Sequence, residues 1–196
     1  MKIFNQWETD VQVEDPGLRN YINVSPVLVP KTGGKNTLVR FWKNKTTLVE
    51  RLMNRLMVPG HFGKKHRLTS KHCNGKSQTV YKIVYQTLER LETQTKKNPI
   101  QVFVKAIENA APREEITAIE YGGARYPQAV ECAPQRRIDL ALKHMTQGAY
   151  QKSFGKKKSM VAALSDEILA AYNMEQAGSH AISKKLELER QADASR

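Results

Sequence analysis

A series of helical periods, interrupted once by a pair of glycines, most constrains the fold of this chain. Apolar residues recur at helical spacing in six stretches, the last of them weak. These stretches cover about residues 47–58, 77–92, 98–111, 134–149, 159–172 and 181–193. Between the third and the fourth, two segments without helical period flank Gly122-Gly123-Ala124, which predicts a β-hairpin over about 114–132. Pro127 restricts its strand to a sheet edge or a bulge. The pattern predicts a mainly α fold, a bundle of five to six helices with one protruding β-hairpin between helices 3 and 4.

Capping residues indicate where several helices begin. Thr47-x-x-Glu50 has the spacing of a capping box, in which each side chain binds a free backbone N–H group. Asn98 before Pro99 and Ser159 after a lysine run are also favourable N-caps. In the first helix the leucines form one stripe. Arg51 and Arg55 should therefore share the opposite side, one turn apart.

The first 43 residues have no helical period. Pro16-Gly17, Pro26, Pro30 and Gly33-Gly34 interrupt this segment repeatedly. We expect an irregular N-terminal arm with at most one short strand, laid on a partner rather than folded alone. The chain is accordingly divided into an arm, residues 1–43, and a helical domain, residues 44–196.

Positive charge is concentrated in one block of the sequence. The chain carries a formal net charge of +13, and residues 31–90 hold 14 basic and two acidic residues. Natural surfaces usually mix both signs, so a block this uneven predicts a polyanionic partner. A membrane is disfavoured because no stretch of about 18 apolar residues and no interfacial amphipathic helix occurs. Trp42, within the block, can stack on a base.

Several fragments of catalytic or metal-binding motifs have simpler explanations. Gly75-Lys76-Ser77 resembles the end of a phosphate-binding loop, but Ser70 stands where the motif needs glycine. A loop rich in histidine could bind zinc, although its spacing matches no common zinc finger. The residues concerned are His61, His66, His72 and Cys73. We expect no metal, with these histidines lying against phosphates.

Hydrolytic chemistry has no clear signature in the sequence. The carboxylates of Asp166-Glu167 fall on a helix, where a solvated face is the ordinary explanation. Cys73 and Cys132 are far apart and are typical of reduced thiols. The sequence therefore predicts neither an enzyme nor a bound cofactor.

Ordered motifs along residues 44–196 carry the most specific signal in the sequence. They are Asn98-Pro99-Ile100-Gln101-Val102-Phe103, Glu108-Asn109-Ala110-Ala111-Pro112-Arg113-Glu114-Glu115, Gly122-Gly123-Ala124-Arg125-Tyr126-Pro127, Pro134-Gln135-Arg136-Arg137-Ile138-Asp139, Lys157-Lys158-Ser159, 163–171 and Lys184-Lys185-x-Glu187-x-Glu189-Arg190. Together these motifs resemble the small-subunit ribosomal protein S-seven family. The arm and the ending Ser195-Arg196 resemble the archaeal and eukaryotic branch. The loop at 60–76 is longer than in compact members of the family.

The resemblance implies a structural constituent of the small ribosomal subunit, located in the cytoplasm. Such a protein binds the 3′ major domain of small-subunit ribosomal RNA (rRNA) and nucleates assembly of the head. It lines the exit site for transfer RNA (tRNA) and the exit channel for messenger RNA (mRNA), beside other proteins of the head and platform. The family has no catalytic residues.

The family pattern, together with the charge distribution, assigns two sets of residues. The residues expected on rRNA are Lys35, Arg40, Trp42, Lys43, Lys45, Arg51, Arg55, Lys64, Lys65, Arg67, Lys71, Lys76, Arg113, Arg136, Arg137, Lys156, Lys157 and Lys158. The hairpin tip facing tRNA consists of Tyr121, Gly122, Gly123, Ala124, Arg125 and Tyr126.

Two functions from other classes remain open. In a DNA-binding transcription factor built on helical pairs, the helix carrying Arg136 and Arg137 would enter a DNA groove. The hairpin of about twenty residues before that helix argues against it, because such proteins use a tight turn. A zinc-dependent nucleic-acid enzyme would instead use the loop from His61 to Cys73, and metal analysis would identify it.

Overall fold

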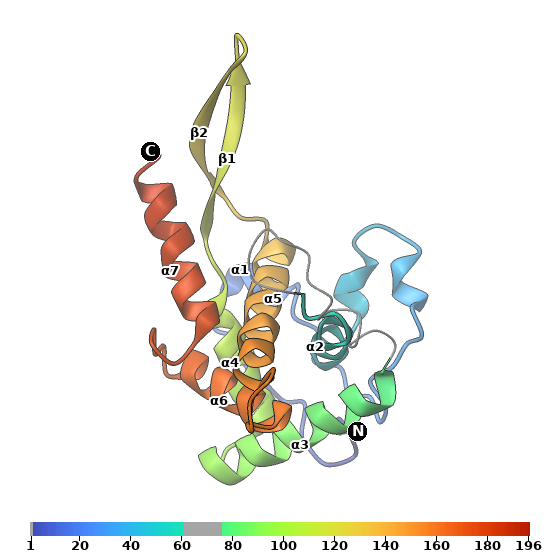
Figure 1. Ribbon diagram of the computed structural model, residues 1–196. Helices are drawn as coiled ribbons and strands as arrows, with labels where there is room; N and C mark the ends of the chain where they lie inside the picture. Colours follow the sequence, from blue (N-terminus) through green and yellow to red (C-terminus); the bar gives the residue numbers. More distant parts are fainter. Residues whose placement is uncertain (1, 61–75) are drawn as a thin grey trace.

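Residues 2–60 and 76–196 are described by the computed structural model (Figure 1). The α-helices are α1 (Pro16–Arg19), α2 (Leu48–Met57), α3 (Ser77–Thr95), α4 (Pro99–Ala110), α5 (Pro134–Ser153), α6 (Met160–Tyr172) and α7 (His180–Asp193). Strands β1 (Glu114–Tyr121) and β2 (Ala124–Glu131) pair between α4 and α5, and short 3-10 helices cover Lys35–Thr37 and Trp42–Lys45. The predicted mainly α architecture is confirmed, and the arm is irregular apart from the one-turn α1 and the short 3-10 helices.

Side-chain caps begin three of the helices as predicted. Thr47, Asn98 and Ser159 each accept a backbone N–H from the first turn of α2, α4 and α6 respectively. The other predicted contact of the capping box, from the Glu50 carboxylate back to the helix start, is wrong. Glu50 Oε1 accepts from the backbone nitrogen of Thr32 at 2.8 Å and from its hydroxyl at 2.7 Å. This carboxylate thus fastens the basic segment before α2 to the helix itself.

The core is centred on α4, which packs against α3, α5, α6 and α7. Val102, Phe103, Val104, Ala106 and Ile107 have no exposed surface. A helix that is apolar on most of its circumference belongs in a protein interior, which agrees with this position.

The first part of the arm belongs to this core. Ile3, Trp7 and Leu18 are buried in it, and the Phe4 ring meets Trp7, Tyr81 and Tyr85 edge-on. The expectation that the arm is laid on a partner is therefore wrong for this part. These apolar residues are scattered without a period, so nothing in the sequence indicates that they pack together. In the structure they join the hydrophobic core of the bundle.

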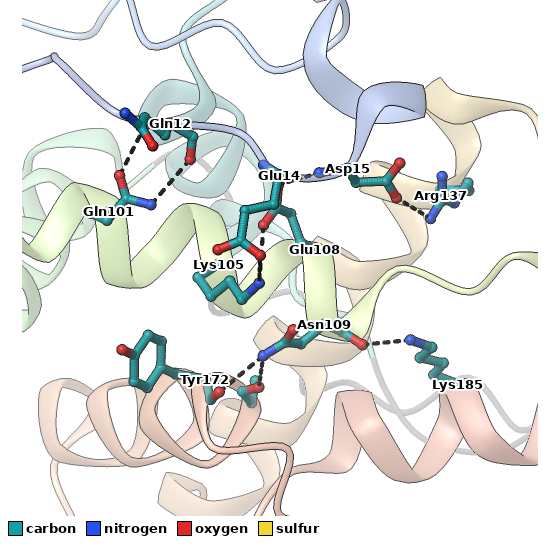
Figure 2. Close-up of polar contacts among 11 residues, drawn as sticks. Gln12, Glu14, Asp15, Gln101, Lys105, Glu108, Asn109, Arg137, Tyr172 and Lys185 are labelled. Carbon is teal, nitrogen blue, oxygen red and sulfur yellow. Dashed lines mark hydrogen bonds and ion pairs between the residues drawn. The ribbon is translucent and has the colours of Figure 1, made fainter.

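Polar contacts attach the next part of the arm to α4 (Figure 2). Gln12 and Gln101 bind each other through backbone and side chain at 3.0 and 3.1 Å. The Glu108 carboxylate accepts the backbone N–H groups of Glu14 and Asp15. Because an extended segment has no internal hydrogen bonds, these side chains replace a sheet partner for it.

The hairpin projects from the helical body as an isolated two-stranded ribbon (Figure 1). Its register runs without a bulge from Glu114 opposite Glu131 to Tyr121 opposite Ala124. Gly122 and Gly123 have φ values of 57° and 83°, as a two-residue primed turn requires. At the base, α7 supports the ribbon, since Glu189 accepts the Arg113 N–H at 3.1 Å.

Candidate nucleic-acid interface

A groove of about 1130 Å³ lies between the segment 32–46, α2 and the N-terminal half of α5. Its basic lining residues are Lys43, Arg51, Arg55, Arg136 and Lys143. Four of them were predicted from sequence, although they come from three separate parts of the chain. Asp139 is the one acidic residue of this lining. We call this hollow the basic groove.

Arg51 forms part of the floor of the basic groove. Its side chain is only 2% exposed, although the leucine stripe places it on the opposite, polar side of α2. The guanidinium donates to the backbone oxygen of Tyr21 at 3.3 Å and to Asp139 at 3.1 Å. Asp139 also accepts from Lys43 at 2.7 Å. One carboxylate therefore holds the buried Arg51 and draws the exposed Lys43 across the groove.

Arg55 and Lys143 face the groove from α2 and α5. Arg55 is half-buried, and its buried Nε has no hydrogen-bond partner among the described residues. Lys143 was not assigned to a site from sequence. The available signal was its spacing of two helical turns from Arg136, which places both on one face of α5.

The two arginines that begin α5 have different surroundings. Arg136 is exposed and binds Glu115 at the base of β1, with its NH2 group 2.6 Å from the carboxylate. That hydrogen bond raises the pKa of Arg136 above its usual value. Arg137 is buried, and it donates to the backbone oxygen of Pro112 at 3.1 Å and to Asp15 at 2.7 Å (Figure 2). Arg137, which was predicted to lie on rRNA, is thus covered by the protein itself and links the arm, the hairpin base and α5.

Burial alone would raise the pKa of Asp15, but the hydrogen bond from Arg137 lowers it below the usual value. This pair is therefore ionised across the neutral range and holds the arm in place.

The other predicted cations occupy separate surfaces. Lys35, Arg40 and Lys45 are exposed on the segment 32–46, whose Lys43 lines the basic groove. Lys76 and Arg113 are exposed elsewhere on the chain. Lys156, Lys157 and Lys158 are exposed in the loop after α5, where Lys158 binds Asp166 at 2.5 Å. α5 has 20 residues, so this lysine loop is about 30 Å from the helix start. The predicted residues Lys64, Lys65, Arg67 and Lys71, and the histidines and Cys73 of that loop, lie outside the described residues.

The hairpin tip exposes an aromatic face. Tyr121 is 81% exposed, and Ile119 and Tyr126 are exposed directly opposite each other. Residues two apart in a strand share a face, so these three side chains project from the same side of the ribbon. Arg125 lies across from Glu120 at 3.6 Å, which leaves the tip with little net charge.

The remaining residues considered as catalytic or metal-binding candidates have structural roles or are unreactive. Glu167 was expected on a solvated face, but it is fully buried. It accepts from Lys152 at 2.5 Å and from the hydroxyl of Ser179 at 2.9 Å. Burial raises the pKa of the Cys132 thiol to about 11, so it is protonated at neutral pH. No cluster of metal-ligating side chains is present in residues 2–60 and 76–196.

None of the helices in the described ranges combines the length and the apolar character that crossing a bilayer requires.

Comparisons with known proteins agree on one family. The family model described as "Ribosomal protein S7p/S5e" matches residues 18–196. The small ribosomal subunit protein uS7 of Nanoarchaeum equitans is 55% identical over 197 residues, covering 100% of this chain and 99% of that protein. The protein of the same name from Methanosphaera stadtmanae is 46% identical over 192 residues, covering 97% and 96%. The chain therefore belongs to the S7p/S5e family of ribosomal proteins and is a protein of the small ribosomal subunit.

Proposed function

We propose that the chain binds the 3′ major domain of small-subunit rRNA and nucleates folding of the subunit head. The basic groove is the single observation that carries this proposal. Five basic side chains converge there around one carboxylate, and the exposed lysines of the adjoining segment extend the same charge outward.

Phosphate binding suits the chemistry of the groove. A guanidinium matches the geometry of a phosphate with two hydrogen bonds, whereas an ammonium supplies a point charge. Arg55 supplies such a guanidinium, half-buried at the lining of the groove. Each neutralised phosphate releases counterions, so binding should weaken steeply as salt is added.

Two basic surfaces at opposite ends of α5 suit an assembly role. The basic groove lies at the start of this helix and the loop Lys156–Lys158 follows its end. A rigid helix holds these surfaces about 30 Å apart. One protein molecule can then fix the spacing of two RNA segments. We infer that this spacing is how the chain organises the head.

The projecting hairpin is proposed to face the exit-site tRNA and the mRNA exit channel. Its nearly uncharged tip and its exposed tyrosines suit stacking and shape contacts with RNA more than strong phosphate binding. Moderate attraction is what a passing tRNA or mRNA requires, because these ligands must leave.

The chain is proposed to act as a structural component of the cytoplasmic ribosome, without catalysis and beside other proteins of the head and platform. Residues 1–43 are best treated as an arm on a helical RNA-binding domain, although the first part of the arm packs in that domain's core. The alternative of a DNA-reading helix loses support because Arg136 is bonded to Glu115 and Arg137 is buried.

The test is binding of the full chain to a 3′ major-domain rRNA fragment at several salt concentrations, with duplex DNA as competitor. We expect tight binding that survives excess DNA and weakens steeply with salt. Equal competition by DNA would reduce the interaction to nonspecific attraction and would contradict the proposal.

A further inference from the structure

We propose that the Phe41 ring stacks on an unpaired RNA base held in the basic groove. This inference rests on the proposed function and names the part of the RNA that the groove receives. Phe41 lines the groove and is 60% exposed. Neither burial in the core nor its own backbone accounts for a phenyl ring at this place.

The backbone conformation at Phe41 disfavours a bulky side chain. Its φ is 69°, in the left-handed region that bulky side chains rarely adopt and glycine adopts freely. An exposed phenyl ring also gains little from the hydrophobic effect in the free protein. A ligand that covers the ring would explain why it is held there.

The charges around Phe41 identify that ligand as part of a nucleic acid. The Arg40 guanidinium carbon lies 5.0 Å from the ring centroid, over one face. A planar ring has two faces, so the other can take a base while Arg40 reaches the adjoining phosphate. Aromatic rings interleaved with cations are the usual platform for unstacked bases.

Trp42, which the sequence predicts can stack on a base, is a weaker candidate. It is 37% exposed, and Lys45 lies 4.0 Å from its ring centroid. Trp42 is also absent from the lining of the basic groove, whereas Phe41 is part of it. We therefore assign base stacking to Phe41.

Amide side chains in the same groove favour an unpaired base over a duplex. Asn36, Asn54 and Gln135 all line it. A carboxamide offers both a donor and an acceptor, which matches the edge of a nucleobase. Double-stranded RNA hides its major-groove edges, so such groups are of most use against unpaired nucleotides.

The test compares variants of the full chain binding the 3′ major-domain rRNA fragment across a salt series. Phe41→Leu keeps an apolar side chain but removes the aromatic face, and Phe41→Tyr retains that face. The matched control is Leu38→Ala, because Leu38 is 82% exposed on the same segment and does not line the groove. We expect Phe41→Leu to weaken binding about tenfold at every salt concentration. The tyrosine variant and the control should bind like the parent chain.

The salt dependence separates stacking from charge. Stacking releases no counterions, so the slope of log affinity against log salt should be the same for Phe41→Leu and the parent chain. Irradiation at a wavelength that links bases to aromatic rings should attach RNA to Phe41. Unchanged affinity of Phe41→Leu, or attachment at Trp42 in its place, would overturn the inference and leave the proposed function standing. Salt-insensitive or absent binding of the parent chain would overturn the proposed function itself.

Discussion

Asp139→Asn should strengthen RNA binding while it destabilises the fold. Asp139 contacts both Arg51 and Lys43 and is the acidic residue of the basic groove. The substitution removes one negative charge from the groove and frees the Lys43 ammonium for a phosphate. It also leaves the buried Arg51 with a neutral partner in place of an anion.

The magnitudes follow from burial and charge. Arg51 is 2% exposed and Asp139 is 36% exposed at the side chain. Asparagine keeps an acceptor and water reaches it, so the expected loss in unfolding free energy is about 1–2 kcal/mol. Removing one like charge near a phosphate gains up to about 1 kcal/mol, roughly fivefold in affinity. One added phosphate contact would also steepen the salt slope by about 0.7–0.9.

The assay pairs urea unfolding with rRNA binding across a salt series. Asp193→Asn is the matched control, because it makes the same chemical change at an exposed residue near the C-terminus, away from the groove. Each variant loses one negative charge, so a general charge effect would change the RNA affinity of both equally. Affinity of Asp139→Asn no higher than that of Asp193→Asn, with both folded, would refute the assignment of RNA to this groove.

Three further predictions concern stability, measured as the free energy of unfolding in urea. Trp7→Ala should cost about 3–5 kcal/mol because the arm is part of the core, and a loss below about 1 kcal/mol would contradict this. Gly148→Ala should destabilise by about 1–3 kcal/mol despite the helix preference of alanine. The added Cβ would lie 2.8 Å from His180 Cβ and 3.0 Å from the Glu167 carboxyl, and a stabilised variant would show that this contact can relax. Burial lowers the pKa of His144 from 6.5 to about 4. Between these values the unfolded chain binds more protons, so lowering the pH from 6.5 to about 4 should reduce the free energy of unfolding by up to about 3 kcal/mol. His144→Gln should flatten this dependence, and an unchanged profile would refute the attribution.

Local signals in the sequence predicted local structure well. Thr47, Asn98 and Ser159 cap their helices, and the glycine pair makes the hairpin turn. These features depend on backbone geometry within a few residues, so the neighbouring sequence contains what is needed to find them.

Features that depend on distant partners were missed. The helical period placed Arg51 on the polar side of α2, but it could not show that Asp139, 88 residues away, covers that side. In the same way Arg137 meets Asp15, and Glu167 meets Lys152 and Ser179. A buried charge looks like a surface charge in sequence until its partner is known. The basic groove itself arises only when three segments come together.

The central claim is that rRNA binds in the basic groove. It is tested most directly by removing two positive charges either inside the groove or outside it and comparing the two variants. One double variant carries Arg55→Gln and Lys143→Gln, both in the groove. The other carries Arg19→Gln and Lys82→Gln, both exposed and outside it. The measurement is the slope of log affinity against log salt for the 3′ major-domain rRNA fragment. The groove variant should bind more weakly, with a slope shallower by about 1.4–1.8, while the other should match the parent chain. Equal slopes for the two variants would contradict the claim.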